Sequence, residues 1–513
     1  MVGGDRRADR NDGGGAVATA VADRNAVRSV TPVKWCAVNI NEVLAGGMRL
    51  EAGVYDVDAR NARDCVTGGR HGWRPLTGAN GFAHAAVGGR FKRIWVESDG
   101  IPIFQPSAVP ELDPEPDGYL SPKTQTDLDA LRAHAGQVLV TCSGTVGKVA
   151  FVSKTLDGQV FSHDLLRITC HEPTDAGYVY AFLKSRAGQL LLCGSQYGAV
   201  ITHIEPEHLA SIPVPDAPED VKRRIHEAVA KSYALRDESN DLLHKAAALL
   251  REALELPPIA EMGGRSSPTA AARGDTRPPV SADATERVPP LCFSVTLADL
   301  RGRLDASYHV PVVREIAAHL RAHAAEVATV GDKRVSKAVI LPGRFKRVYV
   351  EEGYGKVFLG GKQLGELDPS NKKFLSVLHH EKRIADELTL RENMTIVTCS
   401  GTIGRVALVG RHWDGWTASQ HIMRIVPLSP DIAGYLYVWL SSEWAKPLIL
   451  RNSYGAVIDE ISDEQLAAVP VPLLANAVCQ SEINGLALRA SALRSESCDM
   501  EQSALRMMEA VAP

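Results

Sequence analysis

The chain has few of the features that mark secreted, membrane-bound or metal-stabilised proteins. Its nine cysteines form no Cys-x-x-Cys pair and no Cys/His cluster at zinc-ligand spacing, which argues against a disulfide framework and a structural zinc site. A run of about eighteen apolar residues, the length that spans a membrane, is also missing. Residues 1–25 lack the apolar core of a secretory signal. From these absences we expect a cytoplasmic protein.

Catalytic signatures are missing as well. We find no Gly-x-x-x-x-Gly-Lys-Ser/Thr phosphate loop, no Gly-x-Ser-x-Gly nucleophile elbow and no His-Glu-x-x-His zinc motif. The Asp/Asn-Pro-Pro-Tyr/Phe tetrapeptide, with which amino-methylating enzymes hold a flipped base, is absent too. The sequence therefore predicts a non-catalytic protein without a cofactor of its own. Because the formal net charge is −4, any contact with nucleic acid would depend on local basic patches.

What the chain does contain is an internal duplication. TCSGTVGKVAFV at 141–152 returns as TCSGTIGRVALV at 398–409. Other segments that return are GRFKR at 89–93 and 343–347, RLEA at 49–52 as RLDA at 303–306, and YGAVI at 197–201 and 454–458. The offset between equivalent residues drifts only from 254 (89 to 343) to 258 (233 to 491). So long a period indicates two whole domains rather than a solenoid.

The pattern within each copy predicts the fold class. Short apolar runs separated by Gly and Pro are typical of strands. The TCSGT segments predict a strand, a tight Ser-Gly-Thr turn and a second strand, with Gly144 and Gly401 freeing the backbone at the bend. One helix is expected at 176–192, with its counterpart at 433–450. We predict an α+β protein with two tandem, mostly-β domains.

Each copy ends in a long helical segment. Apolar or small residues recur at alternating spacings of four and three from Val221 to Ala253, and again from Cys479 to Val511. A sustained 3.5-residue repeat is typical of a coiled-coil seam. Because neither helix can bury such a stripe alone, we expect the two to form an antiparallel coiled coil. At ~1.5 Å per residue, this spacer would be roughly 55 Å long.

These patterns divide the chain into six parts. The two predicted domains would each precede a long helix, with a Pro-, Gly- and Ser-rich linker between the copies. The predicted parts are a disordered N-terminal extension at 1–32, the first domain at 33–217, the first spacer helix at 218–256, the linker at 257–290, the second domain at 291–474 and the second spacer helix at 475–513.

Basic and polar residues on turns are the candidate contacts with a ligand. Each GRFKR segment sets three cations beside a phenylalanine, which suits phosphate contact, although a strand edge protected by charge is an alternative. Lys148 and Arg405 follow the Ser-Gly-Thr turns as expected exposed cations, either as a phosphate clamp or as ordinary hairpin chemistry. Tyr197 and Tyr454 either present an aromatic edge on a surface loop or pack in a core.

The copies differ where base-reading side chains would be needed. Ser162-His163-Asp164 corresponds to Ser419-Gln420-His421, and the second copy alone has Lys362 and Gln363. Gln, His and Lys can read base edges. The candidate DNA-contacting residues are therefore Arg90, Lys92, Arg93, Ser143, Thr145, Lys148, His163, Tyr197, Arg344, Lys346, Arg347, Lys362, Gln363, Ser400, Thr402, Arg405, Gln420, His421 and Tyr454.

On these residues the chain resembles the specificity subunit of type I restriction-modification systems. The resemblance is carried by the paired turns, the paired YGAVI loops that lead to IPVP at 212–215 and VPVP at 469–472, and the heptad helix after each copy. It covers roughly 34–513 apart from the linker. A specificity factor of a related phage-defence methyltransferase would show the same pattern.

The resemblance implies a function in recognising double-stranded DNA. In that family two domains each bind half of a split site, and the helices set the spacing between the halves. A partner DNA adenine methyltransferase uses S-adenosylmethionine, and a restriction or translocase subunit performs cleavage. The competing hypothesis from the sequence is a tandem-module scaffold that binds protein or glycan.

Overall fold

The computed structural model describes residues 35–45, 48, 52–96, 99–194, 203–262, 293–300, 302–455 and 458–512. The predicted N-terminal extension, most of the predicted linker and Tyr197 lie outside these residues. The chain forms two compact units, residues 1–49 and 50–513. The first contains the short helix α1 (Ile40–Ala45), at whose start the Asn39 side chain accepts a hydrogen bond from the Asn41 amide at 2.9 Å.

Two sheets of four strands form the first repeat within residues 50–513. One sheet is antiparallel, in the order β2 (Ala83–Val87), β9 (Leu165–Cys170), β6 (Val138–Thr141) and β7 (Val149–Phe151). The other has the order β3 (Trp95–Val96), β5 (Gly118–Leu120), β4 (Ile101–Phe104) and β8 (Val160–Phe161), with β4 and β8 parallel. A two-stranded sheet joins β1 (Gly72–Pro75) to β10 (Pro213–Asp216).

The second repeat has the same strand order. Its antiparallel sheet contains β12 (Ser336–Ile340), β19 (Ile422–Pro427), β16 (Thr395–Thr398) and β17 (Val406–Leu408). Its second sheet contains β13 (Tyr349–Val350), β15 (Phe374–Ser376), β14 (Gly355–Leu359) and β18 (Thr417–Ala418), and a two-stranded sheet joins β11 (Glu326–Thr329) to β20 (Pro470–Leu473). The repeated sequence thus folds into a repeated topology.

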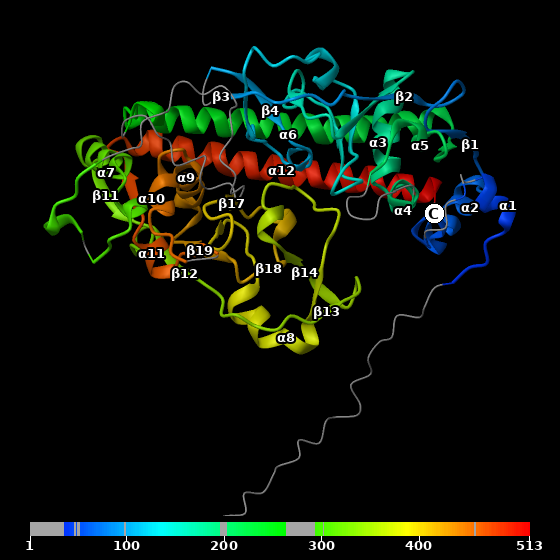
Figure 1. The fold of residues 1–513 in the computed structure, drawn as a ribbon. Coiled ribbons are helices and arrows are strands. Elements are labelled where there is room, and N and C mark those ends of the chain that lie inside the picture. The colour runs from blue at the N-terminus through cyan, green and yellow to red at the C-terminus, as the bar shows by residue number, and fades with distance from the viewer. Residues whose placement is uncertain are drawn as a thin grey trace, which may run out of the picture. The chain divides into compact units, whose positions relative to one another are not determined.

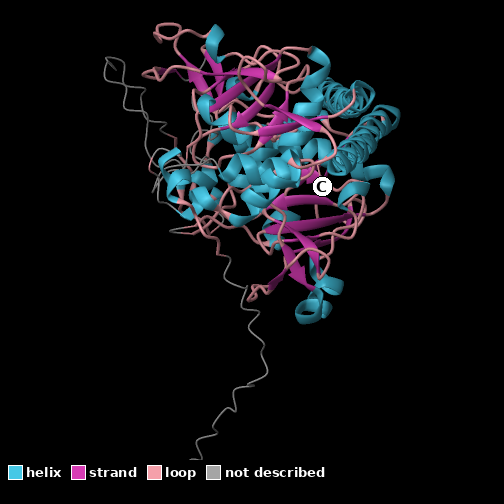
Figure 2. Ribbon diagram, turned by 90° about the vertical axis from the view of Figure 1, so that its right-hand side faces the viewer, coloured by secondary structure: helices cyan, strands magenta, loops and turns pink. Residues whose placement is uncertain are grey.

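Helices cover these sheets. The first repeat has α2 (Val57–Thr67), α3 (Ala176–Lys184), α4 (Arg186–Gly194) and α5 (Pro206–Leu209). The second has α7 (Pro311–His323), α8 (Val377–Arg383), α9 (Pro430–Ser441), α10 (Ala445–Leu450) and α11 (Asp463–Ala467). Figure 2 shows the strands in two groups with helices between them. The described residues therefore have mixed helix and sheet content.

The single helices expected at 176–192 and 433–450 are each two helices. Ser185 separates α3 from α4 with an extended backbone (ψ 164°), and Ser442 ends α9 in the same way (ψ 155°). The Ser185 hydroxyl donates to the carbonyl oxygen of Phe182 at 2.7 Å and accepts from the amide of Gly188 at 3.2 Å. A serine that satisfies backbone groups on both sides of a break competes with the continuous helix.

Two long helices follow the sheets, α6 (Glu219–Ala253) and α12 (Ala477–Val511). The carboxylates of Glu219 and Asp220 stabilise the N-terminus of α6, because the helix dipole is positive there. The Asn476 side chain caps α12 by accepting hydrogen bonds from the amides of Val478 and Cys479. They lie side by side in Figure 1, α6 in green and α12 in red. Every residue of the heptad stripes predicted from the sequence is buried or half-buried.

Contacts between α6 and α12 show that they run in opposite directions. Ser232 lies against Ser497, where the Ser232 hydroxyl donates to the Ser497 carbonyl oxygen at 2.9 Å, and both side chains are fully buried. Further along α6, Lys245 lies 3.1 Å from Glu482 of α12. As residue numbers rise along α6, those of their partners on α12 fall. The small serine side chains allow the close approach of the two backbones.

Both long helices contribute to the main hydrophobic core of each repeat. The first repeat's core includes Ile225 and Val229 from the start of α6, and Ala504 and Met508 from the end of α12. The second repeat's core takes residues from the opposite ends, Leu250 of α6 and Ile483 of α12 among them. Because both helices contribute to the main core of each repeat, the helix pair joins the two repeats in one compact unit.

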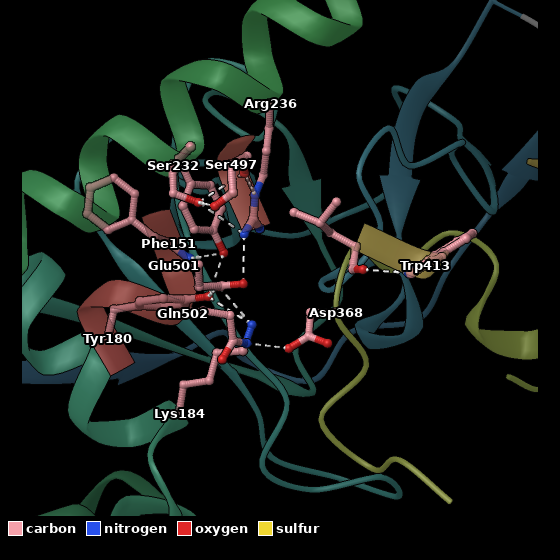
Figure 3. Close-up of polar contacts among 12 residues, drawn as sticks. Phe151, Tyr180, Lys184, Ser232, Arg236, Asp368, Trp413, Ser497, Glu501 and Gln502 are labelled. Atoms are coloured by element: carbon pink, nitrogen blue, oxygen red, sulfur yellow. Dashed lines mark hydrogen bonds and ion pairs between the residues drawn. The ribbon is translucent and has the colours of Figure 1, made fainter. Parts of the chain in front are cut away.

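A buried ion cluster joins α6, α12 and α3. Glu501 of α12 is 1% exposed and lies 2.7 Å from Lys184 and 3.0 Å from Arg236, and the Tyr180 hydroxyl donates to it (Figure 3). Burial alone would raise the pKa of Glu501, but Arg236 and Lys184 lower it to about 2. The cluster is therefore ionised at neutral pH.

Candidate nucleic-acid interface

Strand register brings three segments of each repeat to one end of the antiparallel sheet. In the first repeat, Val87 at the end of β2 pairs with Leu166, and Thr141 at the end of β6 pairs with Leu165. In the second, Ile340 pairs with Arg424 and Thr398 with Ile422. The GRFKR segment, the Ser-Gly-Thr turn and the loop before β9 or β19 therefore all lie at the same end of the strands. We call this end of the sheet the recognition edge.

The Ser-Gly-Thr turns are hairpins, as the sequence predicts. Gly144 and Gly401 have φ angles of 72° and 74°, in the left-handed region that favours glycine. The Thr141 hydroxyl donates to the carbonyl oxygen of Thr145 at 2.6 Å and accepts from the amide of Lys148 at 3.0 Å. Thr398 makes the equivalent bonds in the second repeat. Ser143 and Ser400 are half-buried, and Thr145 and Thr402 are exposed on the turns.

The GRFKR segments are not strands. Both follow β2 or β12 as irregular backbone, and neither pairs with a neighbouring strand. Because these segments are not strands, their cations do not protect a strand edge from pairing, and that alternative is excluded. Arg90, Lys92, Arg344 and Lys346 are exposed, whereas Arg93 and Arg347 are half-buried beside Phe91 and Phe358.

The two basic segments differ in their electrostatic surroundings. Arg344 is 2.7 Å from Glu460, whose side chain also accepts from the Ser400 hydroxyl at 3.3 Å. At the place of Glu460, the first repeat has His203, since Ser143 pairs with His203 as Ser400 pairs with Glu460. Within the described residues neither Arg90 nor Lys92 forms an ion pair. Arg344 is therefore paired with a carboxylate, whereas the equivalent Arg90 has a histidine at that position.

The loop before β9 or β19 carries the divergent polar residues. Gln420 accepts from Arg347 Nε at 3.3 Å and lies 3.3 Å from His421 Nε2. Burial lowers the pKa of His421, and Arg347 lowers it further. Burial likewise lowers the pKa of His163, aided by Arg93 and Arg90 and opposed by Asp164. Both histidines are therefore neutral at pH 7, a state in which an imidazole can both donate and accept a hydrogen bond.

A buried arginine supports this loop in each repeat, and the sequence interpretation missed it. Arg424 of β19 is fully buried and donates to the carbonyl oxygens of Leu388, Ala418, Ser419 and Ile422. Arg167 of β9 does the same with Leu131, Arg132, Phe161 and Leu165. Burial lowers the pKa of each to about 10. The arginine that recurs inside the apolar runs LLRIT at 165–169 and IMRIV at 422–426 is the signal that could have indicated them.

Lys148 and Arg405 are not the exposed cations that the sequence predicts. Lys148 Nζ lies 2.6 Å from Glu366, and Arg405 pairs with Glu111. Their side chains are only 22% and 32% exposed. Each carboxylate comes from the other repeat, so the pairing could not be read from either hairpin alone. Each of these two cations is therefore held in an ion pair within the protein, which argues against the phosphate-clamp interpretation.

The remaining candidates lie in three different environments. Lys362 is exposed, whereas Gln363 is half-buried and its side-chain oxygen accepts from the amide of Gly360 at 2.9 Å, which caps a short turn. Tyr454 is 47% exposed, which favours the surface-loop alternative for this residue. Its backbone pairs with Glu460, so the loop of Tyr454 lies at the recognition edge.

Helix α8 adds cations to the second recognition edge. His380 accepts from the amide of Val348 at 3.1 Å and packs edge-on against Phe345. Arg383 donates to the carbonyl oxygen of Gly343 at 2.9 Å. His379 and Lys382 are exposed on the same helix. The first repeat has no helix between β5 and β6 except a short 3-10 turn among its described residues, so the two edges present different surfaces.

The described residues contain no group of three or more His, Cys, Asp or Glu side chains placed to hold a metal ion. None of their helices is long and apolar enough to cross a membrane. Cys142 and Cys399 are buried beneath the turns, where burial raises their thiol pKa values to about 11 and about 12. This confirms the interpretation of both as small buried residues rather than reactive thiols.

Comparison with family models and with curated proteins finds no match. Among solved structures, the chain is similar to a type I restriction-modification system S subunit from M. genitalium, with 10% identity, 86% of this chain and 98% of that chain covered, and a TM-score of 0.30. An HsdS subunit from Thermoanaerobacter tengcongensis shows 16% identity over 87% and 98% of the chains, with a TM-score of 0.25.

A third similar structure belongs to a study of assembly and conformational transition of the type I R-M system, with 15% identity, 84% and 96% coverage and a TM-score of 0.25. The chain thus resembles specificity subunits over most of both lengths. Because the TM-scores of these three structures are below 0.5, the likeness by itself carries no conclusion about function.

Proposed function

We propose that this chain is the sequence-specific DNA-recognition subunit of a type I-like restriction-modification or related phage-defence system. The observation that carries the proposal is the pair of recognition edges. Each has the same framework of hairpin turn, basic segment and supported loop, and each presents different polar side chains. A shared frame with divergent hydrogen-bonding groups is what two modules that read different sequences require.

The two kinds of residue would divide the contact with DNA. Exposed cations such as Arg90, Lys92 and Lys346 would neutralise phosphates and position the chain without reading sequence. Gln420, His421 and His163, held on loops that a buried arginine braces, would contact base edges. A glutamine can donate to and accept from adenine at once, so Gln420 is the leading candidate reader.

The long helices would act as the spacer. We infer that α6 and α12 form an antiparallel coiled coil that sets the separation of the two half-sites and offers a platform to partner subunits. Those partners would be a DNA adenine methyltransferase, which binds S-adenosylmethionine, and a restriction or translocase subunit. The domain boundaries at 217, 256, 290 and 474 belong to the same proposal.

The test is selection of binding sites from a pool of random DNA duplexes with the whole chain. We expect enrichment of two short conserved elements separated by a gap of fixed length and no preferred sequence. Enrichment of one continuous element would contradict the two-module scheme. If no sequence is enriched while the chain still folds, the protein- or glycan-binding scaffold becomes the better account.

A further inference from the structure

A short motif outside the predicted site is also duplicated. Glu-Leu-Asp-Pro occurs at 111–114 and again at 366–369, an offset of 255. In each repeat it follows a 3-10 turn, which is Pro106–Ala108 after β4 in the first repeat and Gly361–Gln363 after β14 in the second. The motif lies outside the three segments that define each recognition edge, which raises the question of what it contacts.

The two motifs contact each other. Glu111 and Glu366 form an antiparallel bridge, and the amide of Leu112 donates to the carbonyl oxygen of Gly365 at 2.8 Å. Each glutamate then pairs with the cation that follows the Ser-Gly-Thr turn of the other repeat, Glu366 with Lys148 and Glu111 with Arg405. Two equivalent ion pairs therefore cross between the repeats in opposite directions.

Each motif is also anchored on a long helix. Asn240 of α6 donates to the carbonyl oxygen of Leu112 at 2.8 Å, and His244 lies 2.9 Å from Asp113. In the second repeat, Gln502 of α12 donates to Asp368 at 2.6 Å (Figure 3). Trp413 donates its ring N–H to the carbonyl oxygen of Leu367 at 3.0 Å, also drawn in Figure 3. The contact between the motifs is thus fixed to the helices.

From this geometry we propose that the two motifs form an interdomain latch, made of Glu111, Leu112, Lys148, Glu366 and Arg405, that makes the chain selective for the length of the gap between its half-sites. The proposal rests on the proposed function. Glu111 and Glu366 act as positioning residues because they tie the hairpin of one recognition edge to the other repeat, and they need not touch DNA.

The geometry of DNA explains why such a latch discriminates. One added base pair moves a half-site by ~3.4 Å and rotates it by roughly 35°, since a helical turn of ~34–36 Å holds ~10–10.5 base pairs. An ion pair with a 2.6 Å contact cannot follow a displacement of that size without breaking. With the latch closed, the DNA must absorb the misfit by twisting or bending, which costs on the order of 1–6 kcal/mol.

The test compares gap lengths with the double variant Glu111→Gln/Glu366→Gln. Affinity is measured for duplexes that carry the selected site with gaps one or two base pairs shorter or longer. We expect the natural chain to lose ~10-fold or more in affinity per base pair. For the duplex with the natural gap, the affinity of the variant should be within about 3-fold of that of the natural chain. The variant should lose most of the difference in affinity between gap lengths.

A matched control removes two carboxylates that pair within one repeat. Asp241, which pairs with Lys154, and Glu326, which pairs with Arg334, are replaced as Asp241→Asn/Glu326→Gln. This variant should keep the discrimination of the natural chain. The reversed pair Lys148→Glu/Glu366→Lys should keep it as well, because the ion pair is rebuilt with opposite polarity.

A second measurement judges the latch without DNA. Hydrogen exchange at the Leu112 amide, which bonds across the repeats, should accelerate in the Glu111→Gln/Glu366→Gln variant and stay slow in the control. If the variant discriminates gap lengths as sharply as the natural chain, or if exchange at Leu112 is unchanged, the latch is refuted. If the natural chain selects no sequence, the proposed function fails, and exchange alone decides on the latch.

Discussion

At the scale of residues, the basic side chains fall into two groups: exposed cations, which contact phosphates in the proposed function, and cations held in ion pairs within the protein. Arg90 and Lys92 are exposed at the recognition edge, and within the described chain neither forms an ion pair. Lys148 and Arg405 have the same charge but are bound by carboxylates of the opposite repeat. From the sequence, all four were candidate phosphate contacts because they lie on or near turns. Their different environments follow only from the tertiary fold.

The exposed pair gives the first prediction. Replacing Arg90 and Lys92 by alanine should weaken binding to every DNA sequence and make the slope of log affinity against log salt shallower by up to ~2 × 0.9, because two phosphate contacts are lost. Fluorescence anisotropy over a salt series measures this slope. Lys333→Ala/Lys337→Ala is the control, because these exposed lysines lie at or just before the start of β12, away from the recognition edge at the end of that strand. An unchanged slope in the Arg90/Lys92 variant would remove these residues from the interface.

The buried arginine gives a prediction for stability. Arg424→Met keeps most of the side-chain volume but leaves carbonyl oxygens without a donor. An unsatisfied buried polar group costs about 1–3 kcal/mol, so the free energy of unfolding should fall by at least that amount. Urea denaturation measures it. Arg391→Met is the control, since Arg391 is exposed and should change stability by less than about 0.5 kcal/mol. Equal effects would mean that Arg424 is not a structural brace.

At the scale of elements, the long helices combine a largely small and apolar seam with one ion cluster. The heptad spacing was legible in the sequence because it repeats over each whole helix. The burial of Glu501 in an ion cluster could not be predicted, because its partners Lys184 and Arg236 lie 317 and 265 positions away in the sequence (501 − 184 and 501 − 236). A single acidic residue on a helix gives no indication that it will be buried.

The ion cluster predicts how stability depends on pH. The folded pKa of Glu501, about 2, lies below its unfolded value of ~4.3. Its contribution is therefore present above about pH 4.3 and is lost as the pH falls toward 2. Glu501→Gln should lower the unfolding free energy at pH 7 and flatten its decline in acid, as followed by urea denaturation between pH 7 and 3. Glu509→Gln, on an exposed position of α12, should retain the natural pH profile. A profile for Glu501→Gln that parallels the natural one would contradict this role.

Helix length gives a prediction for the DNA site. Inserting seven residues of heptad pattern after Glu238 in α6 and after Glu496 in α12 lengthens the pair by roughly 10 Å. The gap between half-sites should then grow by ~3 base pairs, since each adds ~3.4 Å, while both half-sites keep their sequence. Because the insertion also parts the latch, the selected gap should become less uniform. Site selection reads out both effects. If the half-sites themselves changed, the helices would not be spacers.

At the scale of the whole molecule, much of the design follows from duplication. Repeated segments predicted two domains of one fold, and strand order is the same in both repeats. The hairpins and the divergent loops were also predictable, because turn residues and strand periodicity are local signals. The latch, the hydrogen-bond partners of the buried arginines and the packing of α8 at the second edge depend on contacts between distant segments, for which a single sequence holds no local signal.

The orientation of the two repeats predicts the symmetry of the DNA site that two identical domains would read. Because α6 and α12 run antiparallel and the two ion pairs of the latch cross in opposite directions, we expect an approximate twofold axis to relate the repeats. Two identical recognition domains on this frame would therefore read an inverted repeat. Oligomers with twofold symmetry bind palindromic sites for the same reason.

The most direct test of the central claim is site selection with a domain-exchange variant. Residues 84–170 are replaced by 338–427, which moves the second recognition edge into the first repeat and leaves Tyr180, Lys184 and the Glu501 cluster unchanged. The account predicts that the first half-site disappears and that the second appears twice, as an inverted repeat with the natural gap. Retention of the original first half-site by a folded exchange variant would contradict the assignment of sequence recognition to these edges.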